Sequence, residues 1–327
     1  MLKNLLEFVI QSIKKIDLKN KRVLLRMDFN GLWRIKASLE TINYLLNNGA
    51  GVIVIGHFGR PEKPESKFSL MQFKKYLPQA VELLENLRFD PAEEANDDSF
   101  AKELAQKADI FVQDAFSVCH RKHASVVGIP KFLPSYAGLV LEKEIQSLNR
   151  EFTQPVVYII GGAKVETKLP LIRLIAGKCD QLILGGLIAN AVLANHKIEL
   201  TSIKLHLPID AVTKTGVRAV GSISPKEILD IGPDTISLFA SVIAEAKTII
   251  WNGPMGQFEE EKYQTGTFEI AKAIAESNAY KIIGGGETVA VLEKLNLLNK
   301  INHISTGGGS LLEYLAKGSL QGIEALN

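Results

Sequence analysis

The residues best suited to chemistry in this sequence are two lysines that follow a glycine pair. Residues 161–168 read Gly-Gly-Ala-Lys-Val-Glu-Thr-Lys and come directly after the apolar run 155–160. Glycine lets the backbone turn sharply and approach a ligand closely. Lys164 and Lys168 share one face if a helix has begun, because residues four apart are neighbours on a helix. Such a cationic turn suits the neutralisation of a phosphoryl group, and phosphoryl transfer is therefore our hypothesis.

The first half of the chain places basic and polar residues after each of its apolar runs. They are Arg26, Asp28, Asn30, His57, Arg60, Arg88, His120 and Arg121. Parallel sheets bind ligands outside the carboxyl ends of their strands, so these side chains are expected along one edge. Converging guanidinium groups match phosphate and carboxylate bidentately. The pattern predicts a site for a small phosphorylated acid, although each arginine taken singly could be a solvated surface residue.

The second half places glycines after its apolar runs instead. The clusters lie at 161–162, 185–186, 253, 284–286 and 307–309. A helix that follows such a turn offers unpaired N–H groups and a positive dipole end to phosphates. This favours nucleotide binding, although glycines also serve tight turns. The sequence contains neither GxxxxGK[ST] nor GxGxxG, so no motif supports a P-loop enzyme or a dehydrogenase.

Short apolar runs alternate with segments of helical period along the whole chain. The predicted strands are 22–25, 52–55, 110–112, 156–160, 182–184, 203–207, 248–250, 282–283 and 303–304. The predicted helices are 36–46, 100–107, 139–152, 170–176, 234–246 and 267–277. This alternation predicts an α/β protein with two Rossmann-like βαβ domains, each a parallel sheet with helices on both faces. We expect domains at 1–152 and 153–327, joined by a hinge helix at about 139–152, with the last residues able to pack back on the first domain.

Composition limits the class of protein. A chain of 327 residues fits two domains of roughly 150 residues, and 46% hydrophobic with 23% charged residues is typical of globular proteins. A net charge of +2 is too small for a dedicated nucleic-acid binder. Cys119 and Cys179 form no disulfide framework, which fits a reducing cytosol. The apolar stretch 182–194 is shorter than the ~20 residues of a membrane span, and Lys3 and Glu7 interrupt any signal peptide. We expect a cytoplasmic monomer.

Together these motifs resemble the phosphoglycerate kinase family, from about Lys21 to Leu326. The matching segments are 26–30, 56–61, 85–89, 114–125, 161–168, 251–259, 284–288 and 305–309. The resemblance implies a glycolytic kinase that transfers a phosphoryl group reversibly between 1,3-bisphosphoglycerate and ADP, giving 3-phosphoglycerate and ATP. It also implies Mg²⁺ as cofactor and hinge closure between the domains, with no membrane or nucleic-acid partner.

The resemblance also implies roles for individual residues. In the first domain, Asp28 and Asn30 would bind the glycerate end of the substrate. The substrate phosphate would contact His57, Arg60, Arg88 and Arg121. Arg34 would contact the substrate and neutralise the migrating phosphoryl group together with Lys164 and Lys168, and these three are the expected catalytic residues. The nucleotide-binding positions would be Lys164, Lys168, Asn252, Glu259, Gly285, Gly286, Glu287 and Thr288, with Glu287 as the metal ligand.

The chain departs from the family pattern at several places. It is shorter between Asn30 and Arg34, between residues 76 and 85, and between residues 196 and 207. Ser117 stands where the family commonly has glycine, and Glu287 stands where it has a metal-binding aspartate. An added methylene moves a carboxylate, and Mg²⁺ demands near-ideal octahedral geometry, so slower turnover or altered metal preference is expected. Two functions stay open: an active kinase, and a catalytically weak homologue that binds nucleotide or anionic metabolites.

Overall fold

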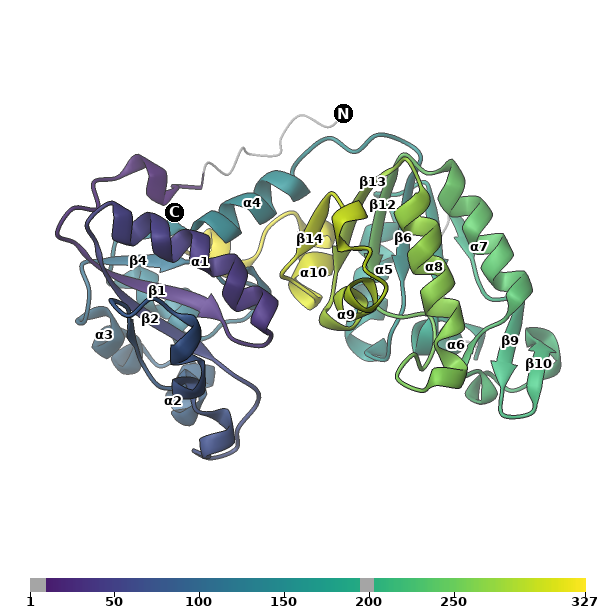
Figure 1. Ribbon diagram of the computed structural model, residues 1–327, viewed down its shortest axis with the longest axis horizontal. Helices are drawn as coiled ribbons and strands as arrows, with labels where there is room; N and C mark the ends of the chain where they lie inside the picture. The colour runs from purple at the N-terminus through teal and green to yellow at the C-terminus, as the bar shows by residue number, and fades with distance from the viewer. Residues whose placement is uncertain (1–9, 195–202) are drawn as a thin grey trace. The chain divides into compact units, whose positions relative to one another are not determined.

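The structure is a computed structural model that describes residues 10–194 and 203–327. The chain divides into two compact units (Figure 1). The first unit runs to Asn149 and includes the C-terminal segment Ser319–Asn327, and the second comprises Arg150–Gly318. Residues 1–9, on which the absence of a signal peptide was judged, lie outside the described residues. So does most of the shortened segment expected between residues 196 and 207.

The first unit contains a parallel sheet of five strands in the order β3-β2-β1-β4-β5. Its strands are β1 (Arg22–Asp28), β2 (Gly51–His57), β3 (Glu82–Leu83), β4 (Ile110–Gln113) and β5 (Ser135–Ala137). The central strand β1 pairs with β2 on one side and with β4 on the other. The strands predicted at 22–25, 52–55 and 110–112 are confirmed, and their carboxyl ends meet at one edge.

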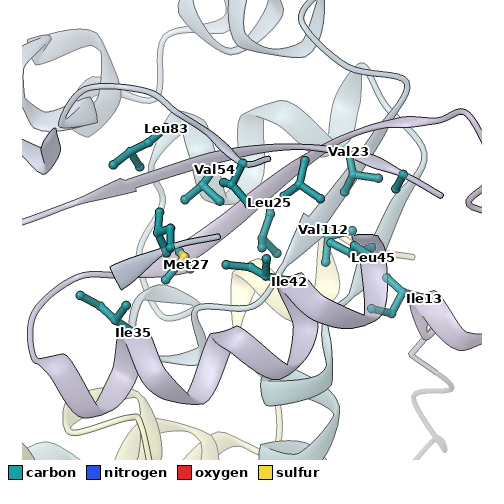
Figure 2. Packing of buried hydrophobic residues seen from close by; sticks show 14 of the residues in the cluster. Ile13, Val23, Leu25, Met27, Ile35, Ile42, Leu45, Val54, Leu83 and Val112 are labelled. Atoms are coloured by element: carbon teal, nitrogen blue, oxygen red, sulfur yellow. The ribbon is translucent and has the colours of Figure 1, made fainter. Parts of the chain in front are cut away.

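The core of this unit lies between the sheet and α1 (Leu32–Asn47). Successive side chains of a strand point to opposite faces. Val23, Leu25 and Met27 therefore share one face of β1 and pack against the helix, as Figure 2 shows. The helix contributes Ile35, Ile42 and Leu45. The alternate residue Arg26 belongs to the opposite face, where it is completely buried.

Further helices of the first unit are α2 (Pro91–Ala95), α3 (Asp98–Ala105), α4 (Leu139–Leu148) and α11 (Gln321–Glu324). Single turns lie at Ile13–Lys15, Ser66–Phe68, Leu87–Phe89, Phe116–Val118, Ala124–Gly128 and Ile129–Lys131, and a 3₁₀ helix of seven residues lies at Leu70–Tyr76. The buried carboxylate of Asp114 accepts a hydrogen bond of 2.9 Å from Val140 N and so caps α4. The segment with α11 is fixed by a bond of 2.8 Å from Gly322 N to the Cys119 carbonyl.

The second unit contains a parallel sheet of six strands in the order β14-β13-β12-β6-β7-β8. Its strands are β6 (Val156–Ile160), β7 (Gln181–Leu184), β8 (Lys204–His206), β12 (Thr248–Asn252), β13 (Tyr280–Gly284) and β14 (His303–Ser305). All six overlap predicted strands. Two mainly parallel sheets in one chain confirm the predicted α/β fold class.

Helices cover this second sheet on both faces (Figure 1). They are α5 (Val165–Ala176), α6 (Gly186–Leu193), α7 (Pro233–Glu245), α8 (Thr265–Glu276), α9 (Gly286–Lys294) and α10 (Gly309–Lys317). Phe239 of α7 and Ile270 of α8 join Trp251 of β12 in one buried cluster. Helix α5 begins at Val165, five residues before the predicted start, and takes Pro170 into its interior. The prediction placed proline in the first turn, where its missing N–H costs nothing.

A small antiparallel sheet in the second unit was not predicted. It consists of β9 (Asp210–Thr213), β10 (Gly216–Ala219) and β11 (Asp230–Ile231) in the order β10-β9-β11. Single turns occur at Val220–Ser222, Pro225–Glu227, Glu261–Tyr263 and Leu298–Lys300. The strands are short and β10 is exposed, so they carry no apolar run. Within the described part of the chain, no helix has the length and apolar character needed to cross a membrane.

Candidate functional site

The carboxyl ends of β1 and β2 bring Asp28, Asn30 and His57 into one hydrogen-bonded group. The Asp28 Oδ1 atom accepts from Asn30 N at 2.7 Å and from Asn30 Nδ2 at 3.0 Å. Asn30 Oδ1 accepts from Gly59 N at 2.9 Å, and Asn30 Nδ2 donates to the His57 carbonyl at 3.4 Å and lies 3.2 Å from His57 Nε2. Asp28 and His57 are buried. Parallel pairing of β1 with β2 sets Asp28 opposite His57, which explains how residues far apart in sequence meet.

His57 is held as a neutral ring with its proton on Nε2. Arg26 Nη2 lies 2.9 Å from His57 Nδ1, and a guanidinium can only donate, so Nδ1 must accept. Burial lowers the pKa of His57 well below its usual value, and the charges of Arg26, Arg88 and Arg121 lower it further. The nearby Asn30 amide nitrogen is itself a donor. The Nε2 proton is therefore suited to an anionic ligand.

Three more arginines, Arg60, Arg88 and Arg121, add positive charge to this region. The pKa of Arg88 is lowered to about 10, chiefly by burial and also by the charges of Arg121, Arg26 and Arg60, whereas Glu94 raises it. The pKa of Arg121 is lowered by burial and then by Arg60. Arg88 Nη1 donates to the Gly59 carbonyl at 2.6 Å, whereas its buried Nη2 has no hydrogen-bond partner among the described residues. A bound anion would relieve the repulsion between these like charges and would accept a hydrogen bond from the unused Nη2. The cluster of arginines therefore favours the binding of an anion.

An acidic group partly balances this charge, and the sequence alone did not reveal it. Arg26 Nε lies 3.4 Å from Ser125 Oγ, and the Ser125 hydroxyl donates to Glu93 Oε1 at 2.5 Å. Glu94, which is exposed, forms an ion pair of 2.9 Å with Nε of the buried Arg88. An arginine inside an otherwise apolar strand was the available signal, since a buried charge requires partners.

Arg34 joins the group from the first turn of α1. Its Nη1 donates to the Asn30 carbonyl at 3.0 Å and lies 3.3 Å from Asp28 Oδ2. The hydroxyl of Ser117 donates to the same Asp28 oxygen. The structure therefore brings Arg34 together with Asp28, Asn30 and His57. Arg88 and Arg121 are close enough to lower the pKa of His57, and Arg60 in turn acts on these two arginines. Arg60 is the exposed member.

In the second unit, the predicted lysines lie at the start of α5. Lys164 is exposed at the N-cap, and Lys168 one turn later donates from Nζ to the Gly161 carbonyl at 2.8 Å. Burial lowers the pKa of Lys168 to about 8, while Glu287 raises it and Lys164 lowers it. Glu287, from the first turn of α9, is therefore close enough to Lys168 to act on its charge.

Glycine residues allow the loops around Lys168 to approach one another closely. Gly162 has φ +85°, which favours glycine, and its N–H donates to the Pro254 carbonyl at 2.8 Å. A β-carbon on Gly186 would lie 2.7 Å from Gly162 N, so the loops after β6 and β7 approach closely. Gly285 has φ +98° at the N-cap of α9, and Gly286 is the first residue of that helix.

Asn252 and Thr288 have structural contacts at the same loops. Asn252 Nδ2 donates to the Gly308 carbonyl at 3.3 Å, and Thr288 Oγ1 accepts from Gly253 N at 2.9 Å. Both side chains are buried. They therefore tie the end of β12 to the loop after β14 and to the first turn of α9, and a phosphate contact from either side chain remains a prediction.

A pocket opens beside these turns. Its lining includes Gly162, Ala163, Gly186, Leu187, Asn190, Ile228, Leu229, Pro254, Met255, Gly256, Gln257, Glu259 and Glu287. An apolar wall with a few polar groups is usual for a small-molecule site. Of the predicted residues, Glu259 and Glu287 line it directly. The apolar wall was missed because Leu187, Ile228 and Met255 come from three separate segments, one of them the first turn of α6.

Comparison with known proteins identifies the family. The family model described as phosphoglycerate kinase matches residues 13–82, 71–203 and 194–318. The phosphoglycerate kinase of Herpetosiphon aurantiacus is 40% identical over 389 aligned positions, covering 97% of this chain and 99% of that protein. That of Moorella thermoacetica is 38% identical, covering 96% and 98%. The chain belongs to the phosphoglycerate kinase family.

Solved structures of the family share the fold. The phosphoglycerate kinase of Coxiella burnetii has a TM-score of 0.81 and 33% identity, and that of Pyrococcus horikoshii has a TM-score of 0.84 and 28% identity. Each comparison covers 97% of this chain and 98% of the other. The alignment to the Herpetosiphon aurantiacus protein spans 389 positions, more than the 327 residues here, so this chain is shortened internally. The family matches meet at 71–82 and 194–203, near two of the expected shortened segments.

The crowded arginines generate a prediction about inorganic phosphate. An anion that binds among them should raise the free energy of unfolding, by about 1.4 kcal/mol at ten times its dissociation constant. Arg121→Gln should reduce this gain, measured by urea denaturation against chloride at equal ionic strength. Arg22→Gln is the control, since Arg22 is exposed and paired with Asp109. An equal gain in wild type and Arg121→Gln would contradict a phosphate site at Arg121.

Proposed function

We propose that this chain is an active phosphoglycerate kinase. The bond between phosphorus and the acyl oxygen of 1,3-bisphosphoglycerate breaks, a new bond forms to a terminal oxygen of ADP, and the 3-phosphoglycerate carboxylate leaves. The reverse reaction uses ATP. The observation that carries this proposal is the group of Asp28, Asn30, Arg34 and His57, which offers the Arg34 guanidinium and the neutral His57 ring as donors to an acid in a chain of this family.

The phosphorylated acid binds to the first domain, residues 1–152. Its glycerate end contacts Asp28 and Asn30. The Nε2 proton of His57 donates to its phosphate, because Arg26 occupies the other ring nitrogen. Arg60, Arg88 and Arg121 neutralise the same phosphate, and the buried unused Nη2 of Arg88 supports this assignment.

The nucleotide binds to the second domain, residues 153–327. Its phosphates contact Lys164 and Lys168 together with the backbone of Gly285 and Gly286, where α9 begins and its dipole favours an anion. Asn252 and Thr288 complete these contacts. Glu259 binds the ribose, which its position in the pocket wall supports.

Catalysis requires the neutralisation of charge more than acid–base chemistry. The transferring phosphoryl group passes through a loose transition state whose charge spreads over its oxygens. Arg34 acts from the side of the acid, and Lys164 and Lys168 act from the side of the nucleotide. The two ligands must meet with water excluded, since ATP would otherwise be hydrolysed.

The residues present fit a magnesium ion held by a single carboxylate. Among the described residues, no three histidine, cysteine or acidic side chains converge on a metal position. Mg²⁺ is commonly held by one or two carboxylates with phosphates and waters, so an all-protein cage is not required. Glu287 lies near Lys168 at the start of α9 and would hold the ion. When bound, Mg²⁺ would neutralise charge on the nucleotide phosphates.

A coupled assay with ATP, Mg²⁺ and 3-phosphoglycerate tests the proposal. Arg34→Ala and Lys164→Ala should each lower kcat roughly 10²- to 10³-fold with smaller changes in KM, because they stabilise charge in the transition state. Lys272→Ala is the control, since Lys272 is exposed and paired with Glu269. A folded wild type that binds Mg-ADP without turnover would favour the alternative, a nucleotide-binding homologue with weak catalysis.

The metal assignment generates a separate prediction. Glu287→Asp should bind Mg-ADP more tightly, because the shorter side chain restores the carboxylate that the family has at this position. Titration calorimetry measures the change, and titration with ADP in EDTA shows how much of it depends on the metal. If both proteins bind Mg-ADP equally, Glu287 is not a magnesium ligand.

The pKa of Lys168, lowered by burial to about 8, predicts proton uptake when nucleotide binds. At pH 8 about half of the Lys168 side chains are charged, and a nearby phosphate raises the pKa, so ADP binding should take up about half a proton. Uptake should vanish at pH 6, where Lys168 is already charged. Calorimetry in buffers of different ionisation enthalpy measures it. Lys168→Met should abolish the uptake, and an unchanged value would mean that Lys168 lies away from the phosphates.

A further inference from the structure

Trp33 lies beside the guanidinium group of Arg34 at the start of α1. The Arg34 Cζ atom is 4.9 Å from the centroid of the Trp33 ring. The indole also folds back on the turn that precedes the helix, because a β-carbon on Gly31 would lie 3.1 Å from Trp33 Nε1. Gly31 has φ +139°, so the backbone here depends on glycine. The ring therefore lies between the N-cap of α1 and the Arg34 guanidinium.

Polar groups hold Arg34 without using all of its donors. Nη1 contacts the Asn30 carbonyl at 3.0 Å and Asp28 Oδ2 at 3.3 Å. The Arg34 side chain is 13% exposed, and its buried Nε has no hydrogen-bond partner among the described residues. One nitrogen thus carries the polar contacts while another is left for a ligand. A guanidinium group that is hydrogen-bonded through one nitrogen can still rotate about that nitrogen. A further contact is therefore needed to fix the plane of the Arg34 guanidinium group.

The turn before Arg34 leaves few residues that could supply this contact. Only Gly31, Leu32 and Trp33 separate Asn30 from Arg34. Gly31 has no side chain, and Leu32 is 46% exposed. An aromatic face attracts a guanidinium and favours a defined arrangement of the two groups. Within this turn, Trp33 is the residue that contacts the charge.

We propose that Trp33 is a positioning residue for Arg34. Its ring holds the guanidinium group near Asp28 so that the unused donors of Arg34 are available to an anion. This inference rests on the proposed phosphoryl transfer and adds the residue that orients its charge-neutralising arginine. Trp33 itself need not touch the substrate.

Two substitutions at Trp33 distinguish the effect of its aromatic ring from the effect of its apolar volume. Trp33→Leu keeps an apolar side chain but removes the ring, and should lower kcat roughly 5- to 30-fold, the factor that corresponds to a cation–π contact. KM for 3-phosphoglycerate should change less. Trp33→Phe should retain most of the activity. Leu32→Ala is the control in the same turn and should leave kcat unchanged, with folding checked by circular dichroism and urea denaturation. Wild-type kcat in Trp33→Leu, or equal losses in both Trp33 variants, would overturn the proposal.

Tryptophan fluorescence provides a readout that does not need turnover. The chain has two tryptophans, and Trp251 is completely buried in the second unit. The difference between the spectra of wild type and Trp33→Phe therefore reports on Trp33. Inorganic phosphate should change this difference spectrum in wild type, and Arg34→Met should abolish the response. A spectrum unaffected by saturating phosphate would overturn the link between Trp33 and the anion. An inactive wild type that still shows the response would contradict the kinase proposal alone.

Discussion

The buried guanidinium of Arg26 determines which nitrogen of His57 carries the proton. A charge taken out of water is costly unless partners compensate it. Arg26 finds them in the Met27 carbonyl, in Ser125 and, through Ser125, in the carboxylate of Glu93. Its remaining contact is His57 Nδ1, which can only accept. One buried cation therefore fixes the tautomer of His57, lowers its pKa and leaves the Nε2 proton for a ligand.

The two units hold their positive charges in different ways. In the first unit, Arg88 stays charged at neutral pH because even a pKa lowered to about 10 lies far above 7. In the second unit, burial lowers the pKa of Lys168 to about 8, so that its charge depends on what lies nearby. Guanidinium suits a permanent, bidentate anion site, whereas an amine adjusts its charge to the ligand. This difference is consistent with a permanent site for the acid and a more adaptable site for the nucleotide phosphates.

The sequence predicted the two parallel sheets and one edge of the site because both depend on local pattern. Apolar runs of strand length located β1, β2 and β4, and the residues that follow parallel strands must meet at one edge. Asp28 and His57 meet in this way. The network of Arg26, Ser125 and Glu93 could not be predicted, since it depends on packing between distant segments. The apolar pocket wall has the same origin, because no single loop there carries a recognisable motif.

The carboxylate of Asp28 shows how tightly this site is constrained. Oδ1 accepts from Asn30 N and Asn30 Nδ2, and Oδ2 receives Ser117 Oγ and Arg34 Nη1. An ionised carboxylate has about four acceptor positions, so all of them are used. A ligand hydroxyl can bond to Asp28 only if one of these donors withdraws. Arg34 makes the longest of the four contacts, at 3.3 Å, and its ring partner would hold it near the site after it withdrew. Under the proposed function, the acid would therefore compete with Arg34 for one oxygen of Asp28, although the acid and Arg34 attract each other.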